Sequence, residues 1–278
     1  MPELPEVETT ARLIRPGTVG RVVRDVDWSW ARSLGTGGPE RFREGVCGAR
    51  IARVTRRAKY VVLELERRGK AAGAVLVHLR MTGRLVVQKA SEEPPPFTRV
   101  SLELDRGVLH FLDVRKFGRV TFEPEGQAAL AHLGPEPLGD EWTVERLRSD
   151  LAARNRAIKP LLLDQEFVAG LGNIYVDESL HAARIHPLLP AARVPRAKAI
   201  ELHAAVRRIL AEAIEREGSS FDGFYRTPEG QPGAYQHLFQ VYGRTGRPCP
   251  RCGTAIRRIV VGQRGTHFCA RCQPRPRA

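Results

Sequence analysis

Four of the five cysteines stand in two pairs near the C-terminal end, and their spacing is the strongest constraint in the sequence. Each pair has the form C-x2-C, and sixteen residues separate the pairs. This spacing is typical of a structural zinc site, in which each pair forms a tight knuckle and four thiolates complete a closed tetrahedron. The metal is expected to be structural because no position is left for water. The expected ligands of one Zn²⁺ are Cys249, Cys252, Cys269 and Cys272.

The segment between the pairs predicts a β-hairpin. Residues 255–268 (AIRRIVVGQRGTHF) form two β-prone runs around GQRG, a pattern typical of two strands joined by a tight turn. Arg264 lies in that turn. His267 is an alternative zinc ligand, although a place on the hairpin is the more ordinary role. Cys47 stands alone, and we expect an inert buried thiol there.

The charge of the chain is uneven. The formal net charge is +14, and residues 236–278 contain nine arginines and no carboxylate. Because a solvated surface usually mixes both signs, this segment favours a polyanionic partner, with nucleic acid the leading candidate. An arginine-rich composition throughout the source proteome is the alternative explanation, but it does not account for the absence of acid.

The N-terminal residues and the apolar runs indicate the compartment. MPELPEVETT lacks the basic start and apolar run of a secretory leader. No run reaches the ~18 uninterrupted apolar residues of a membrane span. We therefore expect a cytoplasmic protein that does not enter membranes. No oligomerisation signal is present, so a monomer is the default expectation.

Residues 1–125 predict an antiparallel sandwich or barrel. They contain eight short β-rich runs separated by turn signals. The exception is residues 3–15, where Val7, Ala11 and Ile14 have helical spacing.

The rest of the chain divides by composition and period. A Pro- and Gly-rich stretch precedes four helical runs, and the loop 218–236 that follows them has no periodicity, as is common for functional loops. The predicted domains are a β-sandwich over 1–125, a linker over 126–142, a helical domain with its loop over 143–235 and a zinc finger over 237–278.

The second residue offers a distinctive nucleophile. Removal of Met1 leaves Pro2 with a free secondary amine, and an α-amino group titrates near ~8, against ~10.4 for lysine. Attack of this amine on an aldehydic carbon gives an iminium that cannot become neutral by losing a proton from nitrogen, which makes it a strong electron sink. Glu3 is adjacent and suited to proton transfer. A Met-Pro start alone, however, is common.

Four motifs together resemble the formamidopyrimidine-DNA glycosylase family. They are MPELPEVETT, RRAKY at 56–60, GLGNIYVDE at 170–178 and the cysteine segment, in the right order over residues 1–273. The family excises oxidised purines from DNA and then cleaves the abasic strand. The resemblance implies an α+β multidomain fold with an N-terminal antiparallel β-sandwich and flanking helix, a helix–two-turn–helix domain and a C-terminal zinc-finger β-hairpin.

The resemblance assigns chemical roles to five positions. Pro2 is the expected nucleophile at the anomeric carbon, and Glu3 the expected proton donor to the opening sugar. Lys59 matches the lysine that acts near the damaged base and the adjacent phosphate. Arg264 matches the arginine that clamps the phosphates flanking the lesion and aids elimination. Asn173 matches a phosphate-binding residue, although its loop also fits an ordinary helix C-cap.

Extrusion of a base leaves a hole in the duplex that apolar or arginine side chains usually fill. Met81, Arg115 and Phe117 match the family's void-filling residues, and Arg154 matches a DNA contact. Without the resemblance, Met81 and Phe117 would be expected in the core. His78 alternates with apolar neighbours and is expected to be structural.

Three departures from the family pattern concern lesion recognition. Arg80 stands where glycine is usual, and Phe97 where a DNA-contacting histidine is typical, so that role is not carried over. The loop 218–236 departs most, and Asp222 places an acid where a basic residue is frequent. Lesion preference is therefore left open.

Three functions follow in order of support. The first is a bacterial bifunctional DNA glycosylase and abasic-site lyase of base excision repair, which binds double-stranded DNA containing 8-oxoguanine, formamidopyrimidines or abasic sites and is associated with the nucleoid when bound. The second is an oxidised-pyrimidine glycosylase of the sister branch, whose members usually begin PEGPE; Leu4 argues against it. The third is a zinc-dependent DNA-binding protein without chemistry.

Overall fold

The chain folds into two units, and each takes residues from two separate parts of the sequence. The computed structural model describes residues 1–35, 37–221 and 223–275, so Asp222 lies outside the described residues. The first unit is Met1–His132 with Arg216–Ala234, and the second is Leu133–Glu215 with Tyr235–Ala278. The sequence analysis assigns the loop after the last helix to the helical domain, whereas in the structure residues Arg216–Ala234 belong to the β-rich first unit.

In the described part of the first unit, eight strands form two antiparallel sheets, which confirms the predicted sandwich. One sheet has the order β1-β6-β7-β5 and the other β2-β3-β4-β8. Each of the eight β-rich runs supplies one strand. They are β1 (Val23–Trp28), β2 (Arg50–Arg57), β3 (Tyr60–Arg67), β4 (Lys70–His78), β5 (Gly83–Gln88), β6 (Thr98–Leu104), β7 (Val108–Asp113) and β8 (Arg119–Glu123).

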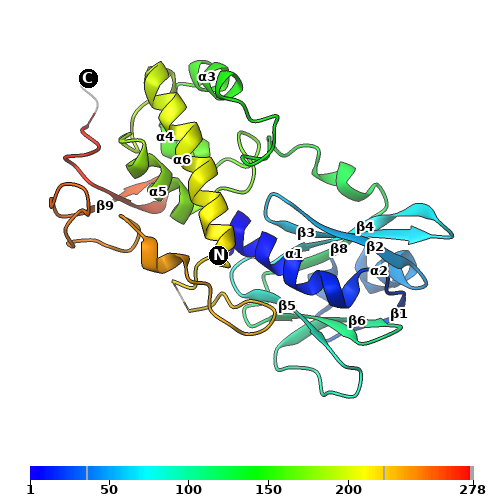
Figure 1. Ribbon diagram of the computed structural model, residues 1–278. Coiled ribbons are helices and arrows are strands. Elements are labelled where there is room, and N and C mark those ends of the chain that lie inside the picture. The colour runs from blue at the N-terminus through cyan, green and yellow to red at the C-terminus, as the bar shows by residue number, and fades with distance from the viewer. Residues whose placement is uncertain (36, 222, 276–278) are drawn as a thin grey trace. The chain divides into compact units, whose positions relative to one another are not determined.

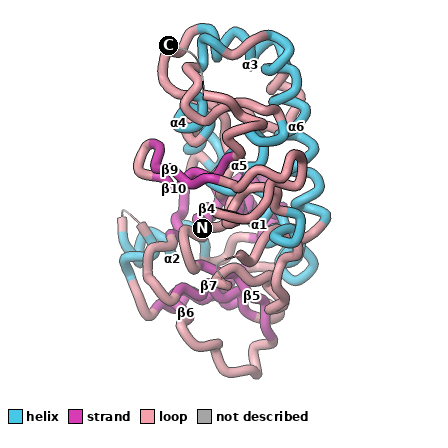
Figure 2. Tube along the Cα trace, turned by 90° about the vertical axis from the view of Figure 1, so that its left-hand side faces the viewer, coloured by secondary structure: helices cyan, strands magenta, loops and turns pink. Residues whose placement is uncertain are grey.

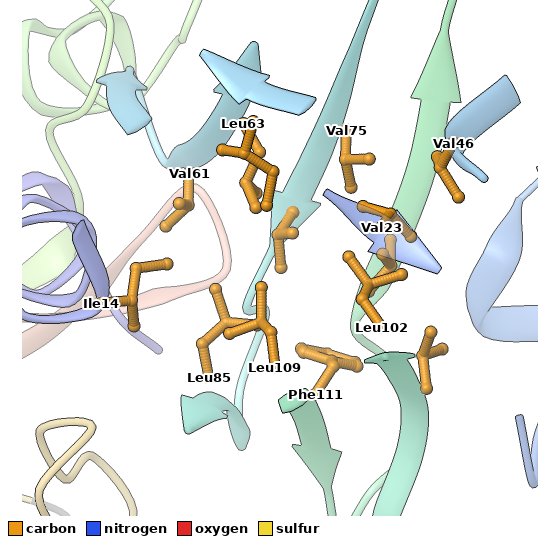
Figure 3. Close-up of a cluster of buried hydrophobic side chains, with 14 of the residues drawn as sticks. Ile14, Val23, Val46, Val61, Leu63, Val75, Leu85, Leu102, Leu109 and Phe111 are labelled. Carbon is orange, nitrogen blue, oxygen red and sulfur yellow. The ribbon is translucent and has the colours of Figure 1, made fainter. Parts of the chain in front are cut away.

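The core of this unit lies between the two sheets. Alternate residues of a strand point to one face, so Val61 and Leu63 of β3 meet Leu109 and Phe111 of β7 (Figure 3). The predicted N-terminal helix is α1 (Leu4–Thr18), which contacts β2 and β3 of one sheet and β5 of the other (Figure 1). The face with Val7, Ala11 and Ile14 is buried, as its spacing predicts.

A second helix in this unit was not predicted. The helix α2 (Gly38–Val46) follows the short 3-10 helix η1 (Ala31–Leu34), and it contacts β1, β4 and β8. Only Phe42 and Val46 of this helix are buried, so its apolar stripe is too short to give a clear period. Another 3-10 helix, η2 (Gly126–Leu130), lies in the stretch expected to be a linker.

The residues described in the second unit form four α-helices and a β-hairpin. The long helix α6 carries a buried stripe at helical spacing, and α5 contacts α4, α6 and β10 (Figures 1 and 2). The hairpin is antiparallel, as predicted between the cysteine pairs. The elements are α3 (Val144–Ala152), α4 (Ile158–Leu162), α5 (Asn173–Ala182), α6 (Arg196–Glu215), β9 (Arg257–Val261), β10 (Arg264–Phe268) and the 3-10 helices η3 (Ala191–Arg193) and η4 (Tyr235–Leu238).

The connection from α4 to α5 is held by one glutamine side chain. Gln165 Nε2 donates to the carbonyl groups of Leu163 and Leu171 at 2.9 Å each, and its Oε1 accepts from Gly170 N at 2.9 Å. Gly172 is the N-cap of α5, and Asn173 is the first helical residue. The C-cap interpretation of this loop is therefore wrong, because the glycines precede a helix.

Among the described residues, no helix combines the length and the apolar character needed to cross a lipid bilayer.

Candidate functional site

The N-terminus of α1 is buried and connected to a distant loop. Pro2 and Glu3 are both buried. Glu3 N donates to Glu6 Oε2 at 2.8 Å, an arrangement typical of one half of a capping box. The other oxygen, Glu6 Oε1, accepts from Ser219 N at 2.8 Å. A single buried carboxylate thus joins the residue that precedes α1 to the beginning of the loop 216–234.

The loop fits closely against this carboxylate. Gly218 has φ +78°, and a Cβ there would lie 2.7 Å from Glu6 Cγ, so only glycine is accommodated. The Tyr225 hydroxyl lies 3.4 Å from the Glu6 carbonyl oxygen and donates to it. Burial raises the pKa of Tyr225 far above its usual value, so the phenol keeps its proton and remains a donor.

Lys59 lies in the turn between β2 and β3 and is buried. The preceding residue, Ala58, has φ 52°, and its carbonyl accepts from Arg56 Nη1 at 3.1 Å. Arg56 Nε also donates to Glu8 Oε2 of α1 at 3.1 Å. The arginine therefore ties the turn that carries the lysine to the helix that follows Pro2 and Glu3.

The three predicted void-filling residues lie on two loops of the first unit. Met81 is half-buried in the β4–β5 turn, and Phe117 is 50% exposed in the β7–β8 loop. The expectation from residue type alone, that Phe117 is a core residue, is therefore wrong. Arg115 stacks on the Phe117 ring, with its Cζ 4.9 Å from the ring centroid.

Arg80 and His78 form the start of the β4–β5 turn. Arg80 has φ 54°, a conformation that glycine adopts without steric cost, which explains the usual glycine at this position. His78 is buried, its Nδ1 accepts from Arg80 N at 3.1 Å, and its ring meets Tyr60 edge-on. Burial and, to a smaller extent, the Arg80 charge lower the pKa of His78 to about 3, so the ring is neutral. These contacts fit the structural role predicted for His78. Phe97 is exposed and also has a positive φ.

In the second unit, the predicted residues Asn173 and Arg264 belong to contacting elements. Asn173 Nδ2 donates to the Gly265 carbonyl at 2.9 Å. Arg264, the neighbour of Gly265, is exposed at the start of β10. Arg154 is also exposed and follows α3. The first turn of α5 and the start of β10 are therefore joined by a hydrogen bond from a side-chain amide to a backbone carbonyl.

A buried ion pair supports the same junction. Lys159 Nζ lies 2.6 Å from Asp177 Oδ1, and the two side chains are 0% and 1% exposed. The lysine also donates to the Gly265 carbonyl at 3.2 Å, and Asp177 Oδ2 accepts from His267 N at 2.8 Å. The His267 ring also lies beside this acid, with Nδ1 3.3 Å from Asp177 Oδ2, and the histidine is not part of the four-cysteine cluster, so the structure favours the hairpin role over zinc ligation.

The segment that precedes the hairpin is fixed by a second acid of α5. Glu178 is buried, and its two oxygens accept from the backbone N–H groups of Gln240, Val241 and Tyr242 at 2.8 to 3.0 Å. Neither Asp177 nor Glu178 was singled out in the sequence. The signal that could have identified them is the presence of two acids in an otherwise buried helix, because a buried carboxylate requires hydrogen-bond or ionic partners.

The four predicted zinc ligands lie together. One sulfur atom from each lies within 4.8 Å of the others, with Cys252 and Cys269 Sγ 3.4 Å apart and Cys249 and Cys272 Sγ 4.0 Å apart. A tetrahedral zinc with bonds of ~2.3 Å requires sulfur separations of roughly 3.8 Å, so the residues fit the ion. The bound ion would link the two knuckles at the base of the hairpin.

The surroundings of this cluster are also ordered. His181 Nε2 of α5 lies 3.4 Å from Cys249 Sγ, and burial lowers the pKa of His181 to about 4. Gln273 connects Cys269 N to the Ile185 carbonyl. Cys47 is not a member of this cluster and is half-buried, and burial raises the pKa of its thiol, which favours the inert protonated form.

The fold and this site match known protein families along the chain. The model of the formamidopyrimidine-DNA glycosylase N-terminal domain matches residues 1–120, and the H2TH domain model of the same family matches residues 133–224. A zinc finger found in FPG and IleRS matches residues 246–275. A β-sandwich, a helix–two-turn–helix domain and a four-cysteine hairpin define a class of DNA-repair proteins, and this chain belongs to the formamidopyrimidine-DNA glycosylase family.

Individual relatives agree over nearly the full length. The formamidopyrimidine-DNA glycosylase of Chloroflexus aggregans is 47% identical over 98% of both chains, and that of Herpetosiphon aurantiacus is 44% identical over 98% of this chain and 100% of its own. The crystal structure of MutM (FPG) from Thermus thermophilus has 40% identity and a TM-score of 0.87, covering 99% of this chain and 100% of that one. A Lactococcus lactis FPG mutant in complex with Fapy-dG-containing DNA has 35% identity and a TM-score of 0.89 at the same coverage.

Proposed function

We propose that this chain is a bifunctional DNA glycosylase and abasic-site lyase that removes oxidised purines in base excision repair. Solved relatives bind DNA that contains Fapy-dG or an abasic site. The observation that carries the proposal is the buried Pro2–Glu3 start, joined through the Glu6 carboxylate to the loop 216–234. The protein would act in the bacterial cytoplasm and on the nucleoid when bound to DNA.

The reaction begins at Pro2 after Met1 has been removed. The neutral secondary amine attacks C1′ of the extruded nucleotide, the bond from C1′ to the base breaks, and the base leaves with the bonding electrons and takes up a proton. Glu3 protonates the sugar ring oxygen as the ring opens, which leaves an iminium between Pro2 and C1′. Loss of a C2′ proton then expels the 3′ phosphate, and a second elimination expels the 5′ phosphate.

The remaining residues bind the DNA. The N-terminus of α5 presents backbone N–H groups and a partial positive charge, a combination suited to a phosphate beside Asn173. Arg264 and Lys59 bind the phosphates near the lesion, and Arg154 contacts the DNA. The zinc ion supplies no chemistry and holds the hairpin that carries Arg264. Met81, Arg115 and Phe117 fill the space left by the extruded nucleotide.

Borohydride trapping tests this proposal directly, because borohydride reduces the iminium to a stable adduct. The protein, with the absence of Met1 verified by mass, is incubated with duplexes containing 8-oxoguanine opposite cytosine, an oxidised pyrimidine or a plain abasic site. An adduct that maps to Pro2 and forms fastest on 8-oxoguanine supports the proposal. Pro2→Gly is expected to lose strand cleavage and retain DNA affinity.

The other outcomes are equally informative. Faster trapping on the oxidised pyrimidine would keep the mechanism and assign the chain to the sister branch. No adduct on any of the three duplexes would overturn the mechanism and favour a DNA-binding protein without chemistry.

A further inference from the structure

One buried carboxylate of the first unit receives donors from two separate loops. Asp113 is the last residue of β7, and its side chain is 1% exposed. Asp113 Oδ2 accepts from Gly118 N at 2.7 Å. Asp113 Oδ1 accepts from Arg115 N at 3.1 Å and from the Thr82 hydroxyl. Thr82 belongs to the β4–β5 turn, whereas Arg115 and Gly118 belong to the β7–β8 loop, so this acid connects the two.

Two further contacts complete the connection. Thr82 Oγ1 accepts from Arg115 N at 3.2 Å, which closes a triangle of hydrogen bonds between the two loops and the carboxylate. Gly118 lies on the core, since a Cβ there would come within 2.3 Å of the Phe111 ring. The ends of the β7–β8 loop are therefore fixed against the sandwich.

The residues between these fixed ends are exposed. Val114 is 55% exposed and Phe117 50%, and Arg115 stacks on the Phe117 ring. Lys116 has φ 61°, and its Nζ lies 4.3 Å from the centroid of the Trp30 ring. Large apolar side chains held in water are unfavourable unless they meet a partner. The loop thus has a rigid base and a projecting apolar tip.

We propose that Asp113 is a positioning residue for base extrusion. By binding Thr82 and the β7–β8 loop at once, it fixes Met81, the neighbour of Thr82, relative to Arg115 and Phe117. The three side chains then enter the base stack as one preorganised group. The conformational entropy needed to order them is therefore lost on folding and not when DNA binds. This inference rests on the proposed function, because it assigns a role within the same reaction.

The site requires a side chain that accepts hydrogen bonds on both of its oxygen atoms. A carboxylate offers acceptor sites on both oxygens, whereas an asparagine amide turns one of them into a donor. In Asp113→Asn, either Gly118 N–H or Arg115 N–H faces an N–H group. Thr82→Val removes the hydroxyl and keeps the branched shape, and Thr82→Ser keeps the hydroxyl. Together, these three variants distinguish the effect of losing a hydrogen bond from the effect of changing the size of a side chain.

The experiment compares a DNA duplex with a single strand, which has no stack of base pairs for the three side chains to enter. Single-turnover base excision is measured on an 8-oxoguanine duplex, and borohydride trapping on a single-stranded abasic oligonucleotide. A third measurement follows the fluorescence of 2-aminopurine placed next to the lesion, in a Pro2→Gly background, so that it requires no chemistry. Ser101→Ala is the matched control, because it breaks a buried hydrogen bond to His110 at 2.9 Å in the same sheet.

The expected pattern is selective. Asp113→Asn and Thr82→Val slow excision from the duplex by about tenfold or more, the effect of losing a hydrogen bond to a charged group. They also reduce the fluorescence change, while trapping on the single strand stays within about twofold of the parent. Thr82→Ser keeps the parent rate of duplex excision, and Ser101→Ala changes none of the three measurements.

Two results would overturn this role for Asp113. One is duplex excision by both variants at the parent rate. The other is an equal loss on the duplex and the single strand, which would indicate general damage to the unit. Failure of the proposed function is distinguishable, because the parent protein would then trap nothing while the fluorescence measurement would still report the effect of Asp113.

Discussion

Replacement of Asp177 is expected to destabilise the second unit strongly, because it breaks a fully buried ion pair. Lys159 and Asp177 are 0% and 1% exposed, with 2.6 Å between Nζ and Oδ1. Removal of one partner from such a pair costs ~3–5 kcal/mol. In Asp177→Asn the amide oxygen and the Gly265 carbonyl still accept from the lysine, so we expect about 3 kcal/mol. This loss corresponds to a decrease in Tm of roughly 10 °C.

A double-mutant cycle tests the origin of this loss. Asp177→Leu, Lys159→Met and the double variant are compared by urea unfolding monitored by circular dichroism. Because the double variant removes both charges of the pair and leaves neither one uncompensated, its loss is expected to be smaller than the sum of the single losses by about 2 kcal/mol. Asp150→Asn is the matched control, since its pair with Arg146 on α3 is exposed and worth less than about 1 kcal/mol. Additive losses, or an effect of Asp177→Asn no larger than that of the control, would refute the reasoning.

Three further predictions concern zinc, salt and pH. Cys269→Ser, or chelation with verified loss of zinc, should weaken DNA binding in fluorescence anisotropy to the level of Arg264→Ala, because the metal holds the hairpin that carries this arginine; unchanged affinity would contradict the link. DNA affinity should fall with salt with a log–log slope of roughly −0.9 per neutralised phosphate, and Arg264→Ala should reduce that slope by about one phosphate; an unchanged slope would exclude the contact. Burial lowers the pKa of His78 to about 3, so below about pH 6.5 the unfolded chain binds a proton that the folded protein does not. The contribution of His78 to the free energy of unfolding is therefore complete above about pH 6.5 and falls by up to ~1.4 kcal/mol per pH unit as the pH drops toward the folded-state value. His78→Asn should flatten this dependence in urea unfolding between about pH 7.5 and pH 5, and a slope equal to that of the parent would count against the assignment.

The regular elements were predictable because their signals are local. Each β-rich run alternates or is continuously apolar between turn residues, and α6 repeats its apolar residues at helical spacing over several turns. The cysteine spacing likewise predicts a compact cluster from sequence alone. The helix α2 was missed because Pro39 and two apolar residues are too few to establish a period.

The contacts that support the site could not be predicted, because they join residues far apart in the chain. Glu6 and Ser219 are separated by 213 positions, and Asp177 and His267 by 90. Composition and periodicity contain no information on which distant segments meet. For Asp113, the sequence shows only an acid before a turn. The burial of this side chain under the β4–β5 turn depends on how two hairpins pack, which the sequence does not show.

The bond between Glu6 and Ser219 also sets an order for folding during synthesis. The eight strands of the sandwich and α1 leave the ribosome first, but Ser219 follows only after the entire helical segment has been translated. Until then, Glu6 Oε1 lacks the backbone N–H and the hydroxyl of Ser219, and water must solvate this oxygen instead. The sandwich can therefore collapse early, whereas the corner that holds the expected nucleophile is completed late, shortly before the zinc hairpin emerges. A nascent chain would thus complete the surroundings of Pro2 only after the helical segment has been made.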